Sequence, residues 1–327
     1  MTKRNWMFGA LVAIGSLVGS AGAHAEFVLD NWTFNADGVD GLTNTGLPAN
    51  QDYTITGIDT WTFNAGFEQD LVDTNGNNVQ DVGEHGTVSG IGKITDMLNG
   101  PSGLGVTVAP ITLNFNGAVG ALVGFEVTFD FQVDYVVTAS SAGGFDFAHT
   151  APTLTTGLLN IYVDNLSDGS VCNTGSGAGC SDGELVGTFL VQAGGGGTVK
   201  FTVFDGSDDA TFEAVFLKDG VWFDQNGNDL GCNNAVAGEE CSGSPLLMSD
   251  SNFDADPDSN NLLDTQIGTR LCGDPRLGGA QTAAHNCGAE DGSVILAAVP
   301  EPTSLAIFSI GLVMLGGVVG MLRQRPN

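Results

Sequence analysis

The sequence predicts an all-β fold for residues 26–299, either an antiparallel β-sandwich or a jelly-roll-like arrangement. Apolar residues take every second place from Phe125 to Tyr135, with polar residues between them, which is the period of a half-buried strand. Shorter apolar runs follow, separated by Gly, Asp, Asn and Ser clusters, as in antiparallel sandwiches. Helical periodicity is missing outside the two ends, so the crossovers of a parallel sheet are not expected. The shorter runs are Leu159–Val163, Leu185–Val191, Val199–Phe204, Phe212–Leu217 and Val221–Phe223.

The N-terminal end predicts an export signal over residues 1–25. Lys3 and Arg4 supply a positive region, Trp6–Val18 an apolar region, and Ala23-His24-Ala25 an A-x-A cleavage site. We therefore expect a signal helix that is removed on export.

The C-terminal end predicts a transmembrane helix. Ser304–Leu322 contains 19 residues without a charge. At helical rise such a run is about 28 Å long, close to the hydrocarbon core of a bilayer, which is about 30 Å. Arg323 and Arg325 follow at once and are expected to stay cytoplasmic, which leaves the preceding chain on the far side of the membrane. Such a tail is either a retained anchor, with small residues for helix packing, or an address that is cut off.

The order of features in residues 300–327 resembles a PEP-CTERM sorting signal. Pro300, Glu301 and Pro302 precede the apolar span, and the basic residues Arg323 and Arg325 end it. The resemblance implies that an exosortase, a cysteine-dependent transpeptidase of the inner membrane, recognises the tail and removes it near Pro-Glu-Pro. It also implies a bacterium that makes exopolysaccharide, and a protein that contacts the membrane only through this tail.

Charge excludes one class of partner. Residues 26–299 hold five Lys or Arg against 37 Asp or Glu, a formal charge of −32. Phosphate backbones are bound by clustered basic residues, so nucleic acid is not an expected partner. Such a charge keeps a chain soluble and attracts divalent cations.

All six cysteines lie in the exported part and fall in neighbouring pairs. An even number in a secreted chain favours disulfides, although six cysteines allow 15 connectivities. We favour the neighbour pairs. Zinc spacing is missing, because there is no C-x₂-C and His85, His149 and His285 are scattered. The pairs are Cys172 with Cys180, Cys232 with Cys241, and Cys272 with Cys287, the last two within a possible Cys-rich subregion, 232–287.

The strongest chemical pattern is Asp73–Glu84, which is typical of a 12-residue calcium loop. Position 6 is Asn78 rather than Gly, and no helices flank the segment, so we expect an isolated loop on a β scaffold. The alternative is an Asn/Gly-rich turn in an acidic protein. Weaker versions occur at Asp224–Asp229 and Asp256–Asp264. The oxygen ligands expected at positions 1, 3, 5, 9 and 12 are the side chains of Asp73, Asn75, Asn77, Asp81 and Glu84, with the main-chain carbonyl of Val79 at position 7.

Two further patterns allow a functional and a structural interpretation. The segment WTFNA occurs at Trp32 and again 29 residues later at Trp61. It predicts either a pair of aromatic side chains that stack on sugars or two equivalent strands with core aromatics. Gly194–Gly197 lacks the helix and the Lys-Ser/Thr of a phosphate loop, so a flexible hairpin turn is expected there.

A narrower resemblance covers residues 32–230 and the tail. Tyr162-Val163-Asp164, then Gly183–Phe189, the glycine run and Trp222–Leu230 are similar to the flocculation-associated PEP-CTERM proteins. The resemblance implies an extracellular structural role, in which the protein holds exopolysaccharide and cells together in flocs.

Two function classes therefore follow from the sequence. The first is a non-enzymatic protein of the extracellular matrix or cell surface that associates with exopolysaccharide and promotes floc or biofilm formation, with calcium as a possible bridging ion. The second is a secreted calcium-dependent carbohydrate-binding protein or carbohydrate-active enzyme. Nucleophile elbows, zinc helices and His-based triads are not visible in the sequence, so no catalytic residue is expected and the first class is favoured.

Overall fold

The computed structural model describes most of the segment between the two ends of the chain. Val28–Ala297 forms one compact unit, and Met1–Phe27 with Ala298–Asn327 forms a second. The predicted signal helix and the predicted tail helix lie outside the described residues. Within the described residues, no helix is long and apolar enough to cross a membrane. The described residues are 27–28, 31–39, 54–77, 80–99, 106–110, 125–152, 156–165, 172, 179–200, 205–232, 241, 245–254 and 285–298.

The described part of the chain is all-β, as predicted, with one short 3₁₀ turn, η1 (Ala36–Gly38), and no α-helix. The strands are β1 (Phe27–Val28), β2 (Trp32–Asn35), β3 (Thr54–Ile58), β4 (Thr60–Leu71), β5 (His85–Asn99), β6 (Val106–Pro110), β7 (Phe125–Ser141), β8 (Gly144–His149), β9 (Leu158–Asn165), β10 (Glu184–Val191), β11 (Gly196–Lys200), β12 (Asp205–Leu217), β13 (Trp222–Phe223), β14 (Pro245–Asp254) and β15 (His285–Ala298).

Strand β7 is the one whose alternation is clearest in the sequence. Its apolar side chains from Phe125 to Tyr135 lie mostly in the interior, while the side chains between Phe131 and Val137 alternate between buried and more accessible positions. Because successive side chains of a strand point to opposite faces, the alternating pattern places one face of β7 in the core. The strand is confirmed and continues to Ser141, but its first part is not half-buried as expected, because Glu126 and Thr128 on the polar face are buried too.

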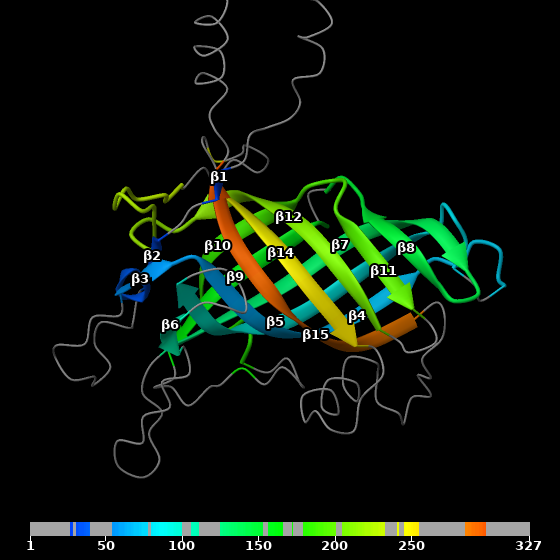
Figure 1. The fold of residues 1–327 in the computed structure, drawn as a ribbon, viewed down its shortest axis with the longest axis horizontal. Helices are drawn as coiled ribbons and strands as arrows, with labels where there is room; N and C mark the ends of the chain where they lie inside the picture. The colour runs from blue at the N-terminus through cyan, green and yellow to red at the C-terminus, as the bar shows by residue number, and fades with distance from the viewer. Residues whose placement is uncertain are drawn as a thin grey trace, which may run out of the picture. The chain divides into compact units, whose positions relative to one another are not determined.

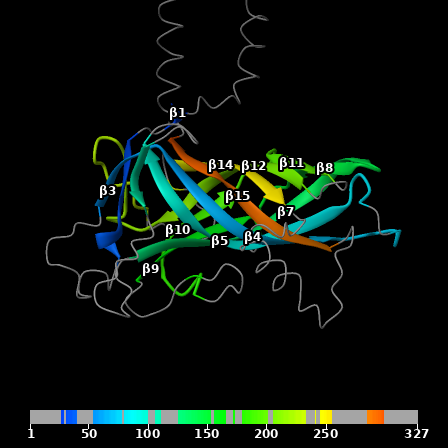
Figure 2. The same ribbon diagram turned by 60° about the horizontal axis from the view of Figure 1, so that its bottom comes forward.

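The large sheet closes on itself. It contains 12 strands, and besides the path β10-β9-β7-β8-β11-β12-β14-β15-β4-β5-β6 it has pairings between β10 and β12 and between β7 and β5. The strands β4, β5, β7, β9, β10, β12, β14 and β15 therefore form a closed circuit of neighbours around an interior (Figures 1 and 2). Closure leaves these eight strands without the open edges that invite aggregation.

The short strands β8 and β11 pair with each other and lie between the long strands β7 and β12. The first half of β7 pairs with β9 and its second half with β8. Likewise, the start of β12 pairs with β11 and its end with β10.

The glycine run 194–197 connects β10 to β11, and these two strands follow each other along the same side of β12. They do not pair with each other there, so the prediction of a hairpin turn is wrong. Glycine is required there because a Cβ on Gly197 would lie 1.7 Å from the main-chain oxygen of Ser207.

The small sheet, β13-β2-β3, packs on the large one through indole rings. Trp32 and Trp61 are each only 1% exposed, with ring centroids 4.9 Å apart, so neither can stack on a sugar in this structure. The two copies of WTFNA are not equivalent strands either, because Trp32 lies on β2 of the small sheet and Trp61 on β4 of the large sheet. The tryptophan of each copy lies in the hydrophobic core.

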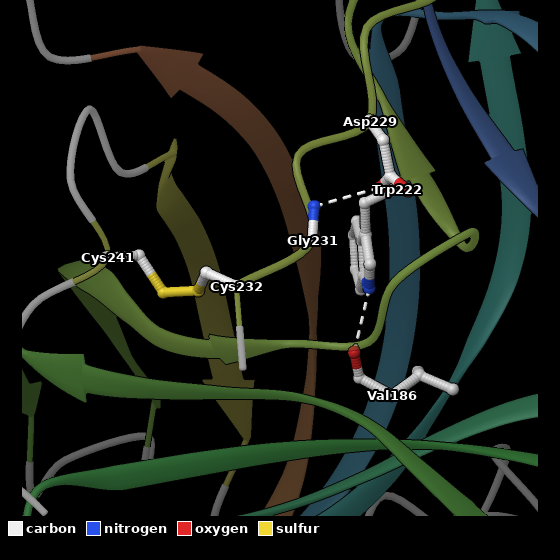
Figure 3. Close-up of a disulfide and its surroundings, with 6 residues drawn as sticks. All are labelled: Val186, Trp222, Asp229, Gly231, Cys232 and Cys241. Atoms are coloured by element: carbon white, nitrogen blue, oxygen red, sulfur yellow. Dashed lines mark hydrogen bonds between the residues drawn. A yellow bond between two sulfur atoms is a disulfide. The ribbon is translucent and has the colours of Figure 1, made fainter. Parts of the chain in front are cut away.

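Trp222 on β13 lies at the centre of this aromatic cluster. Its ring stacks on Trp32 with centroids 5.7 Å apart and meets Phe34 and Phe189 edge to face. Its indole nitrogen donates a hydrogen bond of 2.8 Å to the carbonyl of Val186 on β10 (Figure 3). The ring is fully buried, so this one side chain joins the two sheets by packing and by a satisfied polar contact.

Two of the three predicted disulfides are present. Cys172 is bonded to Cys180, and Cys232 to Cys241, the latter close to Trp222 (Figure 3). Both join neighbours in the sequence, which confirms the local pairing for these four residues. The pair Cys272 and Cys287 stays a prediction, because Cys272 lies outside the described residues.

Strand β5 carries glycine at three buried positions, Gly86, Gly90 and Gly92. A Cβ on Gly92 would lie 2.3 Å from the Cζ of Phe129, and one on Gly90 would lie 2.6 Å from the ring of Phe131. Aromatic rings from β7 therefore lie across the backbone of β5 where side chains would otherwise stand. This arrangement shapes the interior that the eight strands enclose.

Candidate functional site

The predicted calcium loop connects β4 to β5. These strands pair antiparallel from Thr60 opposite Leu98 to Leu71 opposite Gly86, and Val72 donates a 2.8 Å hydrogen bond to the carbonyl of His85. The loop therefore starts and ends on adjacent strands. Two long, paired strands hold its ends at a fixed separation, which limits the entropy that the loop loses when it orders.

Short polar side chains fold the first half of the loop. Asp73 Oδ1 accepts hydrogen bonds from the main-chain N–H groups of Asn75 (3.2 Å) and Gly76 (2.7 Å). Asn75 Oδ1 then accepts one from the N–H of Asn77 at 3.0 Å. Gly76 has φ 73°, the left-handed region that favours glycine. These side-chain turns curl the backbone around positions 1, 3 and 5 of the predicted loop.

The middle ligands converge on one carboxylate. The side-chain amides of Asn75 and Asn77 donate to Asp81 Oδ2 at 2.7 and 2.8 Å. The structure therefore brings positions 3, 5 and 9 together, as the calcium pattern requires. A bound cation would need both amides turned so that their oxygens, rather than their nitrogens, face the ion.

Glu84, the last predicted ligand, joins the two ends of the loop by hydrogen bonds to Thr74 and Asp81. Its Oε1 accepts from the N–H and the hydroxyl of Thr74 at 2.8 and 2.9 Å, and its Oε2 accepts from the N–H of Asp81 at 2.9 Å. The main-chain donors of Asp81 and Thr74 lower the pKa of Glu84, because they stabilise the ionised carboxylate. Both carboxylate oxygens thus hold the loop together in this structure.

The described residues contain no group of three His, Cys, Asp or Glu arranged to hold a metal ion. The three predicted carboxylate ligands, Asp73, Asp81 and Glu84, are therefore not grouped around one point. The loop does bring the two predicted asparagine side chains to Asp81, and the carbonyl of Val79 lies outside the described residues. Calcium at this loop remains a prediction.

Calcium at a concentration of about 1 mM is expected to raise the melting temperature, and magnesium to raise it less, because magnesium demands tighter octahedral geometry. With a Kd of about 0.1 to 1 mM, as in extracellular calcium modules, binding at this concentration stabilises the folded state by about 0.4 to 1.4 kcal/mol. Asp81→Asn, which removes the charge at the convergence point, should abolish most of the shift in a melting experiment. Asp146→Asn, which removes one exposed carboxylate from β8, is the matched control and should keep it. Equal shifts with both ions, or in both variants, would contradict a specific site.

The second acidic loop is a compact turn. Asp224 Oδ1 accepts the N–H groups of Asn226 and Asn228, both at 2.8 Å, and its Oδ2 accepts the amide of Asn228 at 2.7 Å. Burial raises the pKa of Asp224, but these hydrogen bonds outweigh burial and lower it overall. Asp229 caps the turn by accepting from the N–H of Gly231 at 2.9 Å (Figure 3). The loop at 256–264 lies outside the described residues.

Sequence reasoning missed a group of polar side chains that line an interior cavity. Gln69 on β4, His149 on β8, Asp208 on β12 and Glu290 on β15 all line it. They come from four strands far apart in the sequence, so no local motif marks them. A signal does exist in two of the strands, because Gln69 continues the buried alternation of Phe63, Ala65 and Phe67, and His149 continues that of Phe145 and Phe147.

These features define the class of the described part of the chain: an all-β antiparallel structure with two short-range disulfides, which are compatible with an oxidising compartment. Searches with this chain against protein-family models, curated proteins and solved structures find no match.

Proposed function

We propose that this chain is an exported, exosortase-processed protein of the extracellular matrix or cell surface, which associates with exopolysaccharide and promotes floc or biofilm formation. The observation that carries the proposal is the tail, in which Pro300, Glu301 and Pro302 precede an apolar span and a basic end, opposite an N-terminal export signal. In this proposal an exosortase recognises the tail and removes it, and residues 26–299 are the working part of the protein.

The working part is a β-sandwich or jelly-roll-like module in this proposal, and its role is structural rather than enzymatic. The large antiparallel sheet supports a rigid module, and the two disulfides support a life outside the cytoplasm. Short-range bridges of this kind each contribute about 2 to 4 kcal/mol in the chain-entropy description. A stiff, durable module suits a protein that must persist among polysaccharide chains.

Carboxylates are the groups that would meet polysaccharide. Asp209 on β12 stands directly opposite Asp250 on β14, and both are exposed. Burial raises the pKa of Asp209, and the charges of Asp250 and Asp208 raise it further. Like charges directly across a sheet are destabilising, and divalent cations relieve them. A calcium ion bound between these carboxylates and an anionic sugar would reduce their repulsion and would link the protein to the matrix.

Aromatic stacking is a less suitable means of holding sugar. Of the aromatic side chains whose burial the structure describes, none is exposed. This observation favours association through carboxylates and calcium over a conventional aromatic sugar platform.

The tail is tested in the native host with Pro300, Glu301 and Pro302 all replaced by alanine. We expect the variant to stay in the membrane fraction and the culture to settle poorly, because unprocessed protein cannot reach the matrix. Intact-mass measurement of wild-type extracellular protein should show a chain without Ile310–Leu322. Ser89→Ala on β5 is the control and should be processed normally. Recovery of the apolar tail from secreted wild-type protein would refute the proposal.

A further inference from the structure

The interior enclosed by the eight strands contains a cavity of about 80 Å³. Its walls are mainly apolar, with aromatic rings contributed by β4, β7, β8 and β12. The lining includes Trp61, Phe63, Phe67, Phe129, Phe147 and Phe212.

The cavity follows from the way the interior is packed. Its walls come from two hydrophobic clusters of the described residues, one that contains Phe63 and Phe129 and one that contains Phe67 and Phe147. Gly90 and Gly92 contribute no side chains to fill the space, because the rings of Phe131 and Phe129 lie over their backbone. Protein interiors normally leave few voids larger than a water molecule, so a cavity of this size is a distinct feature.

One part of the lining is polar and incompletely satisfied. His149 Nε2 lies 2.8 Å from Asp208 Oδ1. Since a carboxylate only accepts, Nε2 carries the hydrogen, and Nδ1 is then an acceptor whenever the ring is uncharged. The His149 side chain is only 2% exposed, and its Nδ1 has no hydrogen-bond partner. A buried polar atom without a partner is costly, so it marks a place where a ligand can supply the missing hydrogen bond.

A second polar group restricts the charge of that ligand. Glu290 lines the same cavity, and burial raises its pKa to about 7, while a hydrogen bond with Ser251 lowers it in part and the charges of Asp208 and Asp291 raise it. Glu290 therefore exists partly as a neutral acid near neutral pH and can donate or accept. With Asp208 beside it, the cavity disfavours an anion.

We propose that this cavity is a binding site for a small, uncharged aromatic molecule that carries a hydroxyl group, of the phenol class. The ring lies among the aromatic walls, and the hydroxyl donates to His149 Nδ1 beside Glu290. Size sets an upper limit, because an apolar cavity of about 150 Å³ is known to take benzene. A cavity about half as large admits no more than a single ring, and only with small shifts of the surrounding side chains.

The wild-type full chain is titrated with phenol, benzene and benzoate, and binding is followed by calorimetry and by ligand NMR. We expect phenol to bind with a Kd on the order of 1 mM, as a ligand of this size can reach. Benzene should bind about tenfold more weakly, because it lacks the hydrogen bond. Benzoate should not bind. Intermolecular NMR contacts from phenol to Leu247 and Val294 would place it in the cavity. Absent or unsaturable phenol binding, or equal binding of benzoate, would overturn the proposal.

Variants separate the ring site from the hydroxyl site. Ala210→Leu fills the cavity from β12 and should abolish phenol and benzene binding, while Thr211→Leu puts the same side chain on the opposite face of β12 and should not. His149→Leu should bring the ratio of phenol to benzene affinity close to one. An unchanged ratio, or unchanged phenol binding in Ala210→Leu, would overturn the assignment. The contacts to Leu247 and Val294 in the wild type decide the location without any variant, and contacts only to exposed residues would also refute it.

Discussion

Replacing Trp222 with alanine is expected to lower the free energy of unfolding by about 3 to 5 kcal/mol, the range found for large aromatic residues removed from cores. The side chain is fully buried and packs against rings from both sheets, including Trp32 on β2 and Trp61 on β4. Its removal would leave a cavity at the junction of the two sheets, and the carbonyl of Val186 would lose its hydrogen bond from the indole N–H. Urea unfolding at constant pH measures the change.

Two controls separate packing from the hydrogen bond. Trp222→Phe keeps a ring in the stack but loses the donor to Val186, so it should cost less, about 1 to 2 kcal/mol. Gln225→Ala changes an exposed residue three positions further on and should stay within about 0.5 kcal/mol of the wild type. Loss of under 1 kcal/mol in Trp222→Ala would mean that the small sheet is not held by this ring.

Local patterns explain why some strands could be predicted and others could not. The alternation from Phe125 to Tyr135 is a property of neighbouring residues, and it identified β7. Strand β5 has glycine at positions 86, 90 and 92, and glycine weakens a strand signal. Its place in the sheet depends on rings from β7 that cover those glycines. That dependence is tertiary, so the sequence of β5 alone does not reveal it.

The same distinction applies to the sites. The calcium loop is a contiguous segment, and the structure does bring Asn75 and Asn77 to Asp81, as its spacing predicts. The cavity needs four strands whose order in space is not their order in the sequence. Trp32 and Trp61 illustrate the opposite case. The repeated segment WTFNA allowed either a sugar-binding or a core interpretation, and tertiary packing buries both rings.

Raising the pH from about 4.5 to about 7 is expected to destabilise the protein through two carboxyl groups whose pKa values are raised. Burial raises the pKa of Glu290 and of Glu126 to about 7, from a value of 4.5 in the unfolded chain. Between these values the native state binds protons that the unfolded state has lost, so the unfolding free energy falls as the pH rises. The loss is at most about 3 kcal/mol for each group, because each pKa rises from 4.5 to about 7, and solvent screening makes it smaller. Urea unfolding across this range measures the slope.

Three other carboxyl groups with shifted pKa values, those of Glu84, Asp224 and Asp209, do not reverse this trend. The pKa of Glu84 and that of Asp224 are lowered, so the stability that they contribute is lost only as the pH falls below their ordinary values of 4.5 and 3.8. Asp209 has a raised pKa and acts in the same direction as Glu290.

Glutamine variants identify the groups responsible for the slope. Glu126→Gln keeps an acceptor for the N–H of Cys172, and Glu290→Gln keeps one for Ser251, but neither can ionise. Each single variant should remove its own share of the pH dependence and so serve as the control for the other. The double variant should lose much less stability between pH 5 and pH 7 than the wild type, and Asp209 accounts for part of the loss that remains. If the double variant keeps the wild-type slope, the carboxyl groups that titrate in this range lie elsewhere, and Glu290 is ionised in the cavity at neutral pH.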